Sequence, residues 1–198
     1  YFRWRAGLFA QEQFHSGLLH HDASPAAGYT DLEAMKADRS LMSEIASAPH
    51  EAQIAFLLDY DSLWAVQLQP HHREFDYMRY LFVCYRALQR LGLPADILST
   101  EADLSPYKMV IVPTASLATE QLAASLKAFA EAGGTALIGV RSGCKTISNR
   151  FIDHPLPGLF RDLVGITVSD WHSLPPGVSY DLSSTVPGII GPATVWAE

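Results

Sequence analysis

Glu12 and His15 stand three residues apart in a segment rich in aromatic side chains. A carboxylate and an imidazole on one turn can accept and donate hydrogen bonds to the hydroxyls of a polyol. The same spacing also fits a charge-assisted pair on a surface turn that binds nothing. Four aromatic residues nearby offer flat faces on which a sugar ring can dock, or that simply cap a barrel: Phe2, Trp4, Phe9 and Phe14.

Metal and phosphate sites have weaker support. Asp59 and Asp61 follow an apolar run, at the edge where doubly wound sheets bind ligands, and two carboxylates there could hold a divalent cation. The pairs His20–His21 and His71–His72 are poor chelators, because neighbouring side chains diverge in regular structure. The residues after Asp61 are bulky and apolar, unlike the small residues of a phosphate loop. We expect no metal and no cofactor.

A nucleophile of the glutamine-amidotransferase kind needs a cysteine on a tight turn after a strand, with a base beside it. The corresponding turn here is Pro113-Thr114-Ala115-Ser116, which has no thiol. Ser116 also lacks the glycines of a hydrolase elbow. Cys144 has basic neighbours that could lower the pKa of its thiol, but no base is identifiable. Cys84 falls on an apolar helical face and is expected in the core.

Composition excludes several classes of function. The 198 residues carry a formal net charge of -7 and no basic stripe, which argues against nucleic-acid and anionic-membrane surfaces. No apolar run reaches the length of a membrane span. The two cysteines are too few for a disulfide framework, so we expect a cytoplasmic protein.

The first fifty residues predict a strand, a linker and a helix. Residues 1–5 alternate aromatic and basic side chains, the pattern of a strand, yet nothing precedes them for pairing. We therefore expect a piece of a longer protein. Residues 23–29 have linker composition, and Thr30-Asp31-Leu32-Glu33 fits a capping box that opens a helix ending at Ala48-Pro49. Four residues share the apolar face of that helix: Leu32, Met35, Met42 and Ile45.

From residue 53 the pattern alternates strand and helix. Strands are predicted at residues 53–58, 95–98, 109–112 and 135–140, the first and last as buried strands. Helices are predicted at residues 74–91, closed by Gly92, and behind Thr119, closed by Gly133-Gly134. This order predicts an α/β fold with a doubly wound parallel sheet of flavodoxin-like type, also described as class I glutamine-amidotransferase-like.

Less regular segments complete the prediction. Residues 60–73 are expected to form a long apolar loop that serves as a contact surface through Leu63, Trp64, Val66 and Leu68. A short helix is expected near residues 158–163 and a strand near residues 166–168. The tail at residues 193–198 alternates like a strand and stops abruptly.

Several ordered strings together resemble the family 42 glycoside hydrolases, the bacterial β-galactosidases. They begin with Phe2-Arg3-Trp4-Arg5, the segment from Glu12 to Leu19 with His21-Asp22, and Asp59-Tyr60-Asp61-Ser62-Leu63-Trp64-Ala65. Further strings extend the likeness to the end of the chain: residues 104–113, Ala132-Gly133-Gly134-Thr135, Arg141-Ser142-Gly143, Leu156-Pro157-Gly158 and Val195-Trp196-Ala197-Glu198. Two departures are His20, where proline is common, and residues 144–150, which lack an acidic run.

The resemblance implies a three-domain enzyme with a catalytic (β/α)₈ barrel, a central flavodoxin-like domain that drives trimerisation, and a small C-terminal β domain. It implies residues 1–24 as the end of the barrel, 25–50 as linker and helix, 51–175 as the trimerisation domain, and 176–198 as the connection onward. Glu12 and His15 then match substrate-binding residues that hold galactose hydroxyls.

The same resemblance implies that the chain holds no catalytic residue. The family cleaves terminal β-galactosides with retention, using two glutamates roughly 5 Å apart from earlier barrel strands. We therefore expect no glycosidase activity from this chain alone, and self-association into a homotrimer through the Leu63–Trp64 segment and the aromatic face of the helix at residues 74–91. The alternative is an independent flavodoxin- or amidotransferase-like domain that binds a small molecule without catalysis.

Overall fold

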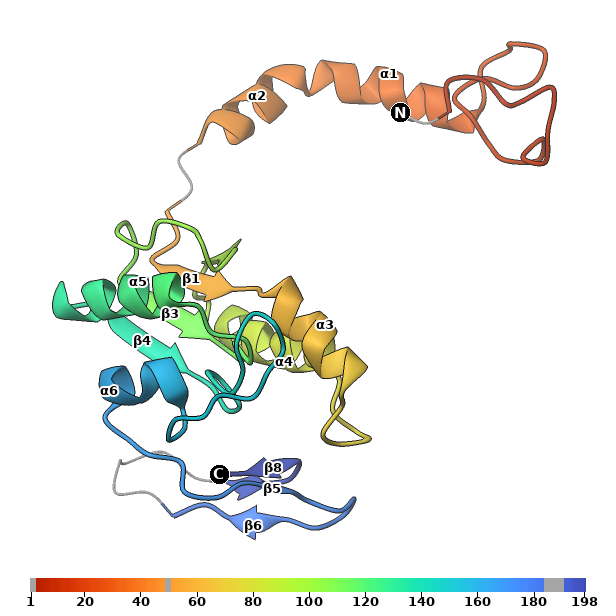
Figure 1. The fold of residues 1–198 in the computed structure, drawn as a ribbon. Coiled ribbons are helices and arrows are strands. Elements are labelled where there is room, and N and C mark those ends of the chain that lie inside the picture. Colours follow the sequence, from red (N-terminus) through yellow and green to blue (C-terminus); the bar gives the residue numbers. More distant parts are fainter. Residues whose placement is uncertain (1–2, 49–50, 184–190) are drawn as a thin grey trace. The chain divides into compact units, whose positions relative to one another are not determined.

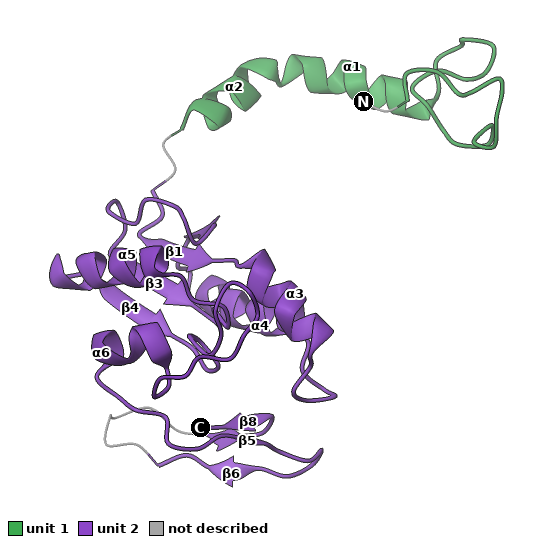
Figure 2. Cartoon of the chain, viewed as in Figure 1, with its two compact units in different colours: residues 1–50 green, residues 51–198 purple. Residues whose placement is uncertain are grey.

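The computed structural model describes residues 3–48, 51–183 and 191–198 of the chain. These residues divide into two compact units, residues 1–50 and residues 51–198, shown in two colours in Figure 2. Within the described ranges, no helix combines the length and apolar character needed to cross a membrane.

Unit 1 contains two helices, α1 (Ala27–Ala37) and α2 (Arg39–Ser47). The predicted capping box at Thr30 is wrong, because the helix begins three residues earlier and Thr30 lies inside it. The start is set instead by the backbone: the N–H of Ala26 donates to the carbonyl of Leu18 at 2.9 Å and fixes the direction of the chain. The single predicted helix is also two, because Asp38 leaves helical geometry between them.

The predicted N-terminal strand is not a strand in the described residues. Arg5 forms one isolated parallel bridge with Leu19, while Tyr1 and Phe2 lie outside the described residues. A strand needs a row of backbone hydrogen bonds to a neighbouring strand. In the described residues of unit 1, Arg5 has one bridge partner, which is too little to form a strand.

Unit 2 is built on a parallel sheet of four strands, β1 (Ile54–Leu57), β2 (Ala95–Leu98), β3 (Met109–Val112) and β4 (Thr135–Ile138). The strand order is β2-β1-β3-β4 (Figure 1). Phe56 of β1 lies opposite Ile97 of β2 and Ile111 of β3, which fixes the register at the centre of the sheet. The predicted α/β class and parallel sheet are confirmed.

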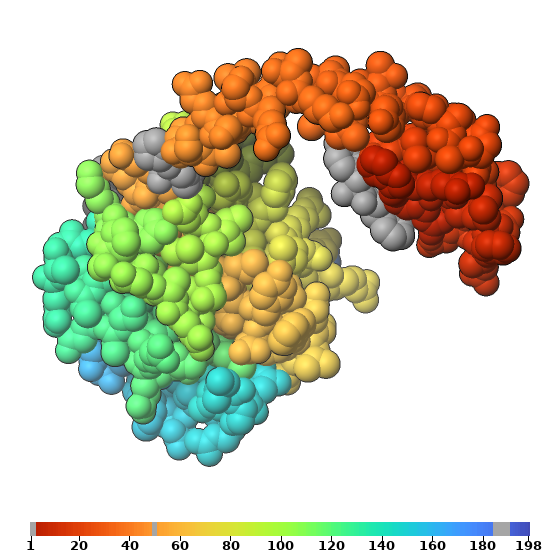
Figure 3. All heavy atoms as spheres, turned by 90° about the horizontal axis from the view of Figure 1, so that it is seen from above, coloured from red at the N-terminus to blue at the C-terminus, as the bar shows by residue number. Residues whose placement is uncertain are grey.

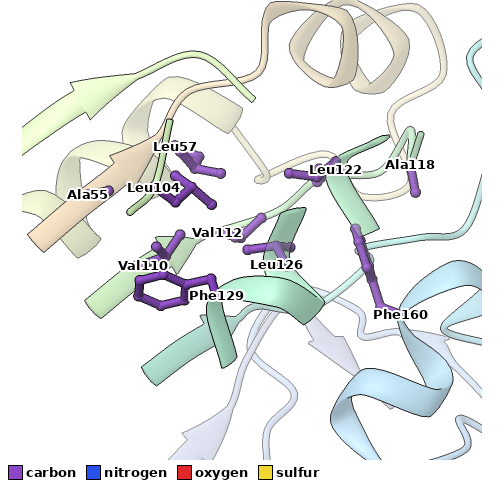
Figure 4. Close-up of a cluster of buried hydrophobic side chains, with 11 residues drawn as sticks. Ala55, Leu57, Leu104, Val110, Val112, Ala118, Leu122, Leu126, Phe129 and Phe160 are labelled. Carbon is purple, nitrogen blue, oxygen red and sulfur yellow. The ribbon is translucent and has the colours of Figure 1, made fainter. Parts of the chain in front are cut away.

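Helices cover both faces of this sheet, because successive residues of β1 point to opposite sides. On one face Leu57 and Val112 pack with Leu126 and Phe129 of α5 (Glu120–Glu131), the cluster drawn in Figure 4. The other face packs against α3 (Tyr60–Leu68) and α4 (Tyr77–Arg90). Its side chains are Ile54, Phe56, Ile111, Leu63, Val66, Tyr77, Leu81 and Leu88.

The predicted signals at the ends of α4 and α5 are confirmed. Thr119 caps α5 by accepting the N–H of Leu122 at 3.1 Å, as expected from the threonine. Gly92 and Gly133 follow the two helices with φ of +68° and +94°, a backbone conformation that favours glycine. At the start of α4, Asp76 accepts the N–H of Arg79 at 2.6 Å.

The predicted loop at residues 60–73 is wrong, because its first nine residues form α3. Asp59 caps this helix by accepting the N–H of Asp61 at 3.1 Å. Of the four residues predicted as a contact surface, Leu63 and Val66 are buried in the core, whereas Trp64 and Leu68 are exposed. Apolar residues lie on both the buried and the exposed side of α3, so its sequence lacks the contrast between an apolar and a polar face that predicts a helix.

Strand β4 is shorter and more open than the buried strand predicted at residues 135–140. Ala136 and Ile138 pack against the cluster around α5, but Leu137 on the other face is 54% exposed. The strand is one edge of the sheet, so among the described residues of unit 2 it has a neighbouring strand on one side alone.

The C-terminal part is assembled from short elements. A 3₁₀ turn η1 (Gly158–Phe160) leads into α6 (Arg161–Val164), where a short helix was predicted. The predicted strand at residues 166–168 is reduced to one bridge between Leu156 and Val168. Two antiparallel pairs follow: β5 (His172–Ser173) with β8 (Trp196–Ala197), and β6 (Tyr180–Asp181) with β7 (Pro192–Ala193).

Candidate functional site

The turn that carries Glu12 and His15 projects from a small parallel frame in unit 1. The N–H groups of Leu18 and Leu19 donate to the carbonyls of Arg3 and Trp4 at 3.2 and 2.9 Å. Gly17 is required at this crossing, because a Cβ there would lie 2.9 Å from the backbone nitrogen of Ala6. The frame holds both ends of the intervening loop, so the loop presents its side chains from a fixed base.

Arg3 holds the Glu12 carboxylate. Its Nη2 forms an ion pair with Glu12 Oε2, and its Nη1 donates to the Glu12 backbone carbonyl at 3.2 Å. His15 Nδ1 lies 3.9 Å from the same Oε2, and the N–H of His15 donates to the Glu12 carbonyl at 3.2 Å. The structure therefore brings the two predicted residues together on one turn, with both side chains open to solvent.

The aromatic side chains around this turn are also open. Phe14 is 99% exposed and Phe9 is 82% exposed, and Trp4 is exposed as well; Phe2 lies outside the described residues. A second support of the loop comes from His21, whose Nε2 lies 2.6 Å from the carbonyl of Gln13. A carboxylate, an imidazole and apolar rings on one surface are the components that contact a sugar's hydroxyls and faces.

At the carboxyl edge of the sheet in unit 2, where doubly wound folds bind ligands, two buried serines bond to the protein's own backbone. The hydroxyl of Ser62 accepts the N–H of Leu117 at 3.0 Å. The hydroxyl of Ser142 accepts the N–H of Ala115 at 3.1 Å and donates to the carbonyl of Gly139 at 2.8 Å. Both serines are buried, so backbone donors that could face a ligand are satisfied internally.

The candidate nucleophiles of unit 2 are not activated. Burial raises the pKa of the Cys144 thiol to about 11, and outweighs the opposite influence of Arg141 and Lys145. The basic neighbours act in the expected direction, but the net lowering of this pKa considered from the sequence does not occur. Burial likewise raises the pKa of Cys84, and Ser116 is buried. The internally bonded backbone donors and the raised pKa values of both thiols disfavour the amidotransferase-like alternative.

The carboxylates and histidines considered for metal binding have other roles. The Asp59 carboxylate caps α3. His71 and His72 have different partners: His72 Nδ1 accepts the N–H of Glu74 at 3.0 Å, and the His71 ring lies 6.2 Å from that of Trp196. Across the part of the chain that the structure describes, no three His, Cys, Asp or Glu side chains are grouped so that they could hold a metal ion.

Sequence reasoning missed a cluster of aromatic and charged side chains that fastens β8 to the rest of unit 2. We call this cluster the C-terminal clamp: Phe75, Arg141, Trp196 and Glu198. The Trp196 ring lies 4.1 Å from the Phe75 ring and 5.0 Å from the Arg141 guanidinium carbon. Arg141 Nε is 2.8 Å from Glu198 Oε1, as an ion pair in which the N–H does not point at the carboxylate. Buried polar partners far apart in sequence leave no local pattern.

Acid is expected to weaken the contact beside this clamp. Burial, then the charges of Arg141 and Lys145, lower the pKa of His71 below its ordinary value of 6.5. The unfolded chain therefore binds a proton at higher pH than the folded one. The contribution of neutral His71 to stability is complete above pH 6.5 and is lost as pH falls through the lower pKa of the folded state.

This effect is measured by urea unfolding between pH 5 and pH 7.5. The wild-type midpoint should fall with acid more steeply than that of His71→Gln. His154→Gln, at an exposed histidine, is the matched control and should keep the wild-type slope. Equal slopes for wild type and His71→Gln would contradict the assignment.

Comparison with known proteins identifies the chain's relatives. Residues 52–198 match the family described as the β-galactosidase trimerisation domain. A β-galactosidase from Thermus thermophilus is 35% identical over 200 residues, covering 100% of this chain and 30% of that protein. The solved β-galactosidase of Halorubrum lacusprofundi is 37% identical with a TM-score of 0.77, covering 100% of this chain and 29% of the other.

A catalytic mutant of a GH42 β-galactosidase from G. stearothermophilus has the same fold at 25% identity, with a TM-score of 0.81. The match covers 100% of this chain and 29% of that one. The chain thus spans less than a third of the length of these relatives. The family match extends from β1 to β8 and so takes in the whole of the sheet, its helices and the C-terminal clamp. This chain belongs to the β-galactosidase trimerisation domain family of the family 42 glycoside hydrolases.

Proposed function

We propose that this chain serves a family 42 β-galactosidase as its self-association domain and as one edge of its galactose site. The longer protein would hydrolyse terminal β-D-galactosides with retention. The observation that carries the proposal is the continuity of the likeness: relatives named as β-galactosidases align with the entire chain, and the trimerisation-domain match takes up all of unit 2 except its first residue.

The four segments of the proposal are residues 1–24 as the end of a (β/α)₈ barrel, 25–50 as linker and helix, 51–175 as the trimerisation domain and 176–198 as a connection. The loop that carries Glu12 and His15 begins and ends at the hydrogen-bonded residues 3–6 and 18–19, which supports a barrel origin for the first segment, since barrel enzymes carry their site residues on loops. The sheet order β2-β1-β3-β4 supports the flavodoxin-like type for the third, because that fold orders its strands 2-1-3-4-5.

Self-association is the function of unit 2 in this proposal, and its product is a homotrimer. The family description names trimerisation, and α3 and α4 expose large apolar side chains such as Trp64 and Phe82. Monomeric proteins rarely leave apolar patches of this kind uncovered. We place the protein in the cytoplasm, where its two free thiols stay reduced, and without nucleic-acid or membrane partners.

The isolated chain should not hydrolyse galactosides. Retaining hydrolysis needs an acid/base glutamate and a nucleophilic glutamate roughly 5 Å apart. Glu12 is engaged with Arg3 and His15 and fits a binding role. The proposal assigns the two catalytic glutamates to barrel strands of the longer protein. Release of nitrophenol from nitrophenyl β-galactoside by the purified chain would contradict this part of the proposal.

Glu12 and His15 are proposed to bind galactose hydroxyls. In the longer enzyme, Glu12→Gln should lower kcat/KM for nitrophenyl β-galactoside roughly 10- to 150-fold, because a hydrogen bond to a charged group contributes about 1.5–3 kcal/mol. Gln keeps the shape of the side chain and removes its charge, so the loss reports the carboxylate.

Glu33→Gln is the matched control for this experiment. Glu33 is a carboxylate on α1 that pairs at 2.5 Å with Lys36, one turn along the same helix. Its replacement should leave kcat/KM within about twofold, since exposed ion pairs contribute little. Equal kcat/KM values for Glu12→Gln and wild type would remove Glu12 from the galactose site.

A further inference from the structure

Helix α3 presents an acidic and apolar stripe to solvent. Tyr60, Asp61, Trp64 and Leu68 are exposed, with Trp64 at 55% and Leu68 at 81%. These positions recur with helical spacing, and the rings of Tyr60 and Trp64 lie 5.9 Å apart. The helix contains one carboxylate and no basic residue. In Figure 3 the helix, coloured light orange, lies at the surface of unit 2.

Helix α4 presents a basic and apolar stripe. Its exposed side includes Met78, Arg79, Phe82, Val83 and Arg86, again at helical spacing. The helix holds three arginines and no acidic residue, although the chain carries a net charge of -7. The α4 stripe is therefore positively charged, whereas the chain as a whole is negatively charged.

A cavity lies along the α4 stripe. Its volume is about 140 Å³, and it is lined by apolar side chains of α4, β1 and β2. Met78, Phe82 and Ile97 form part of this lining, and all three are exposed. The cavity is open to solvent and its lining is almost wholly apolar, so an aromatic ring can pack against it.

We propose that the α3 stripe of one copy docks on the α4 stripe of the next copy, with the Trp64 ring in the cavity beside Met78, Phe82 and Ile97. This inference rests on the proposed self-association. Three copies related by a threefold axis contact each other head to tail, so each copy needs two different, complementary surfaces. The acidic stripe and the basic stripe meet that requirement.

Charge selects this pairing over the like-with-like ones. Contact between two α4 stripes would place arginines against arginines, and contact between two α3 stripes would bring the carboxylates together. Like charges across an interface are unfavourable, whereas opposite charges align and steer the partners. The aromatic and aliphatic side chains at the centre of both stripes then supply the apolar contact.

Charge reversal tests the pairing on the full 198-residue chain. The single variants Asp61→Arg and Arg86→Asp should each weaken the trimer at least tenfold in low salt, as measured by sedimentation velocity. The double variant in one chain restores opposite charges on the two stripes and should return the assembly to within about threefold of wild type. Trp64→Ala should also dissociate the trimer.

Lys127→Glu is the matched control, because Lys127 is an exposed cation on α5, which packs on the other face of the sheet. It should leave the trimer unchanged. Trimers that survive both single reversals and Trp64→Ala overturn this interface and leave the proposed function standing. A double variant no better than the single ones overturns the pairing of the two stripes. A wild-type chain that is monomeric or dimeric overturns the interface and the proposed self-association together.

Discussion

Gly139→Ala is expected to destabilise unit 2 by at least about 3 kcal/mol, because an added methyl group here has no space. The new Cβ would lie 1.9 Å from the carbonyl oxygen of Pro113 and 3.1 Å from the Tyr80 hydroxyl oxygen. The N–H of Gly139 also donates to the carbonyl of Val112 at 2.8 Å, so the backbone cannot move away without losing the contact between β3 and the end of β4. Urea unfolding followed by circular dichroism measures the change.

Gly92→Ala separates this clash from the conformational preference of glycine. Gly92 has a φ of +68° and nothing within 4 Å of an added Cβ. Its replacement should cost about 1–2 kcal/mol, since only the left-handed backbone is penalised and no atom is displaced. Equal free energies of unfolding for Gly139→Ala and Gly92→Ala would contradict the steric clash expected at position 139.

Glu198→Ala is expected to destabilise unit 2 by about 3–5 kcal/mol, because it leaves a buried cation without its carboxylate. The Arg141 side chain is 7% exposed, and its Nε lies 2.8 Å from Glu198. The same carboxylate accepts the backbone N–H of Arg141 at 3.2 Å, which would lose its partner as well. Thermal and urea unfolding both report the change, and loss of the Trp196 contact should alter the tryptophan fluorescence.

Asp170→Ala is the control, because Asp170 pairs with His172 on the strand that β8 joins, with both side chains exposed. Exposed pairs contribute about 0–1 kcal/mol, so this variant should be close to wild type. A Glu198→Ala variant as stable as Asp170→Ala would contradict the role given to the C-terminal clamp.

The sheet could be predicted from sequence where local signals agree. Residues 95–98 and 109–112 were predicted as strands and form β2 and β3 with the same ends. Each is a short run of mainly apolar residues enclosed by polar or turn-forming ones, which is typical of a strand in a covered sheet. Strand β3 is mostly buried, whereas β2 leaves Ile97 exposed. Thr119 likewise predicts the start of a helix, because its hydroxyl can accept a backbone N–H. Gly92 predicts the end of a helix, because glycine readily adopts a positive φ.

The failures share a cause, which is dependence on distant parts of the chain. The start of α1 is set by a hydrogen bond from Ala26 to Leu18 rather than by the Thr30 motif. Helix α3 conceals its period because Leu63 and Val66 face the core while Trp64 and Leu68 face outward. In both places tertiary contacts override the local pattern.

The binding residues of the candidate site could be predicted from sequence, but the residues that hold them in place could not. Glu12 and His15 were singled out by spacing and by the family resemblance, and the structure places them on one turn. Arg3, which holds the carboxylate, was predicted as part of an alternating strand and of a family string, but not as a partner of Glu12. A cation among aromatic residues near a glutamate was the available signal. For Cys144 the basic neighbours suggested a lowered thiol pKa. Burial raises that pKa instead, and burial depends on the fold and is not visible in the local sequence.

The oligomeric mass of the purified chain in solution tests the central claim most directly. Size-exclusion chromatography with light scattering should give three times the 21.8 kDa mass of the chain, and the trimer should persist on dilution through the micromolar range. A single species at 21.8 kDa over that range would contradict the account, because the domain would then lack the association that its family description names.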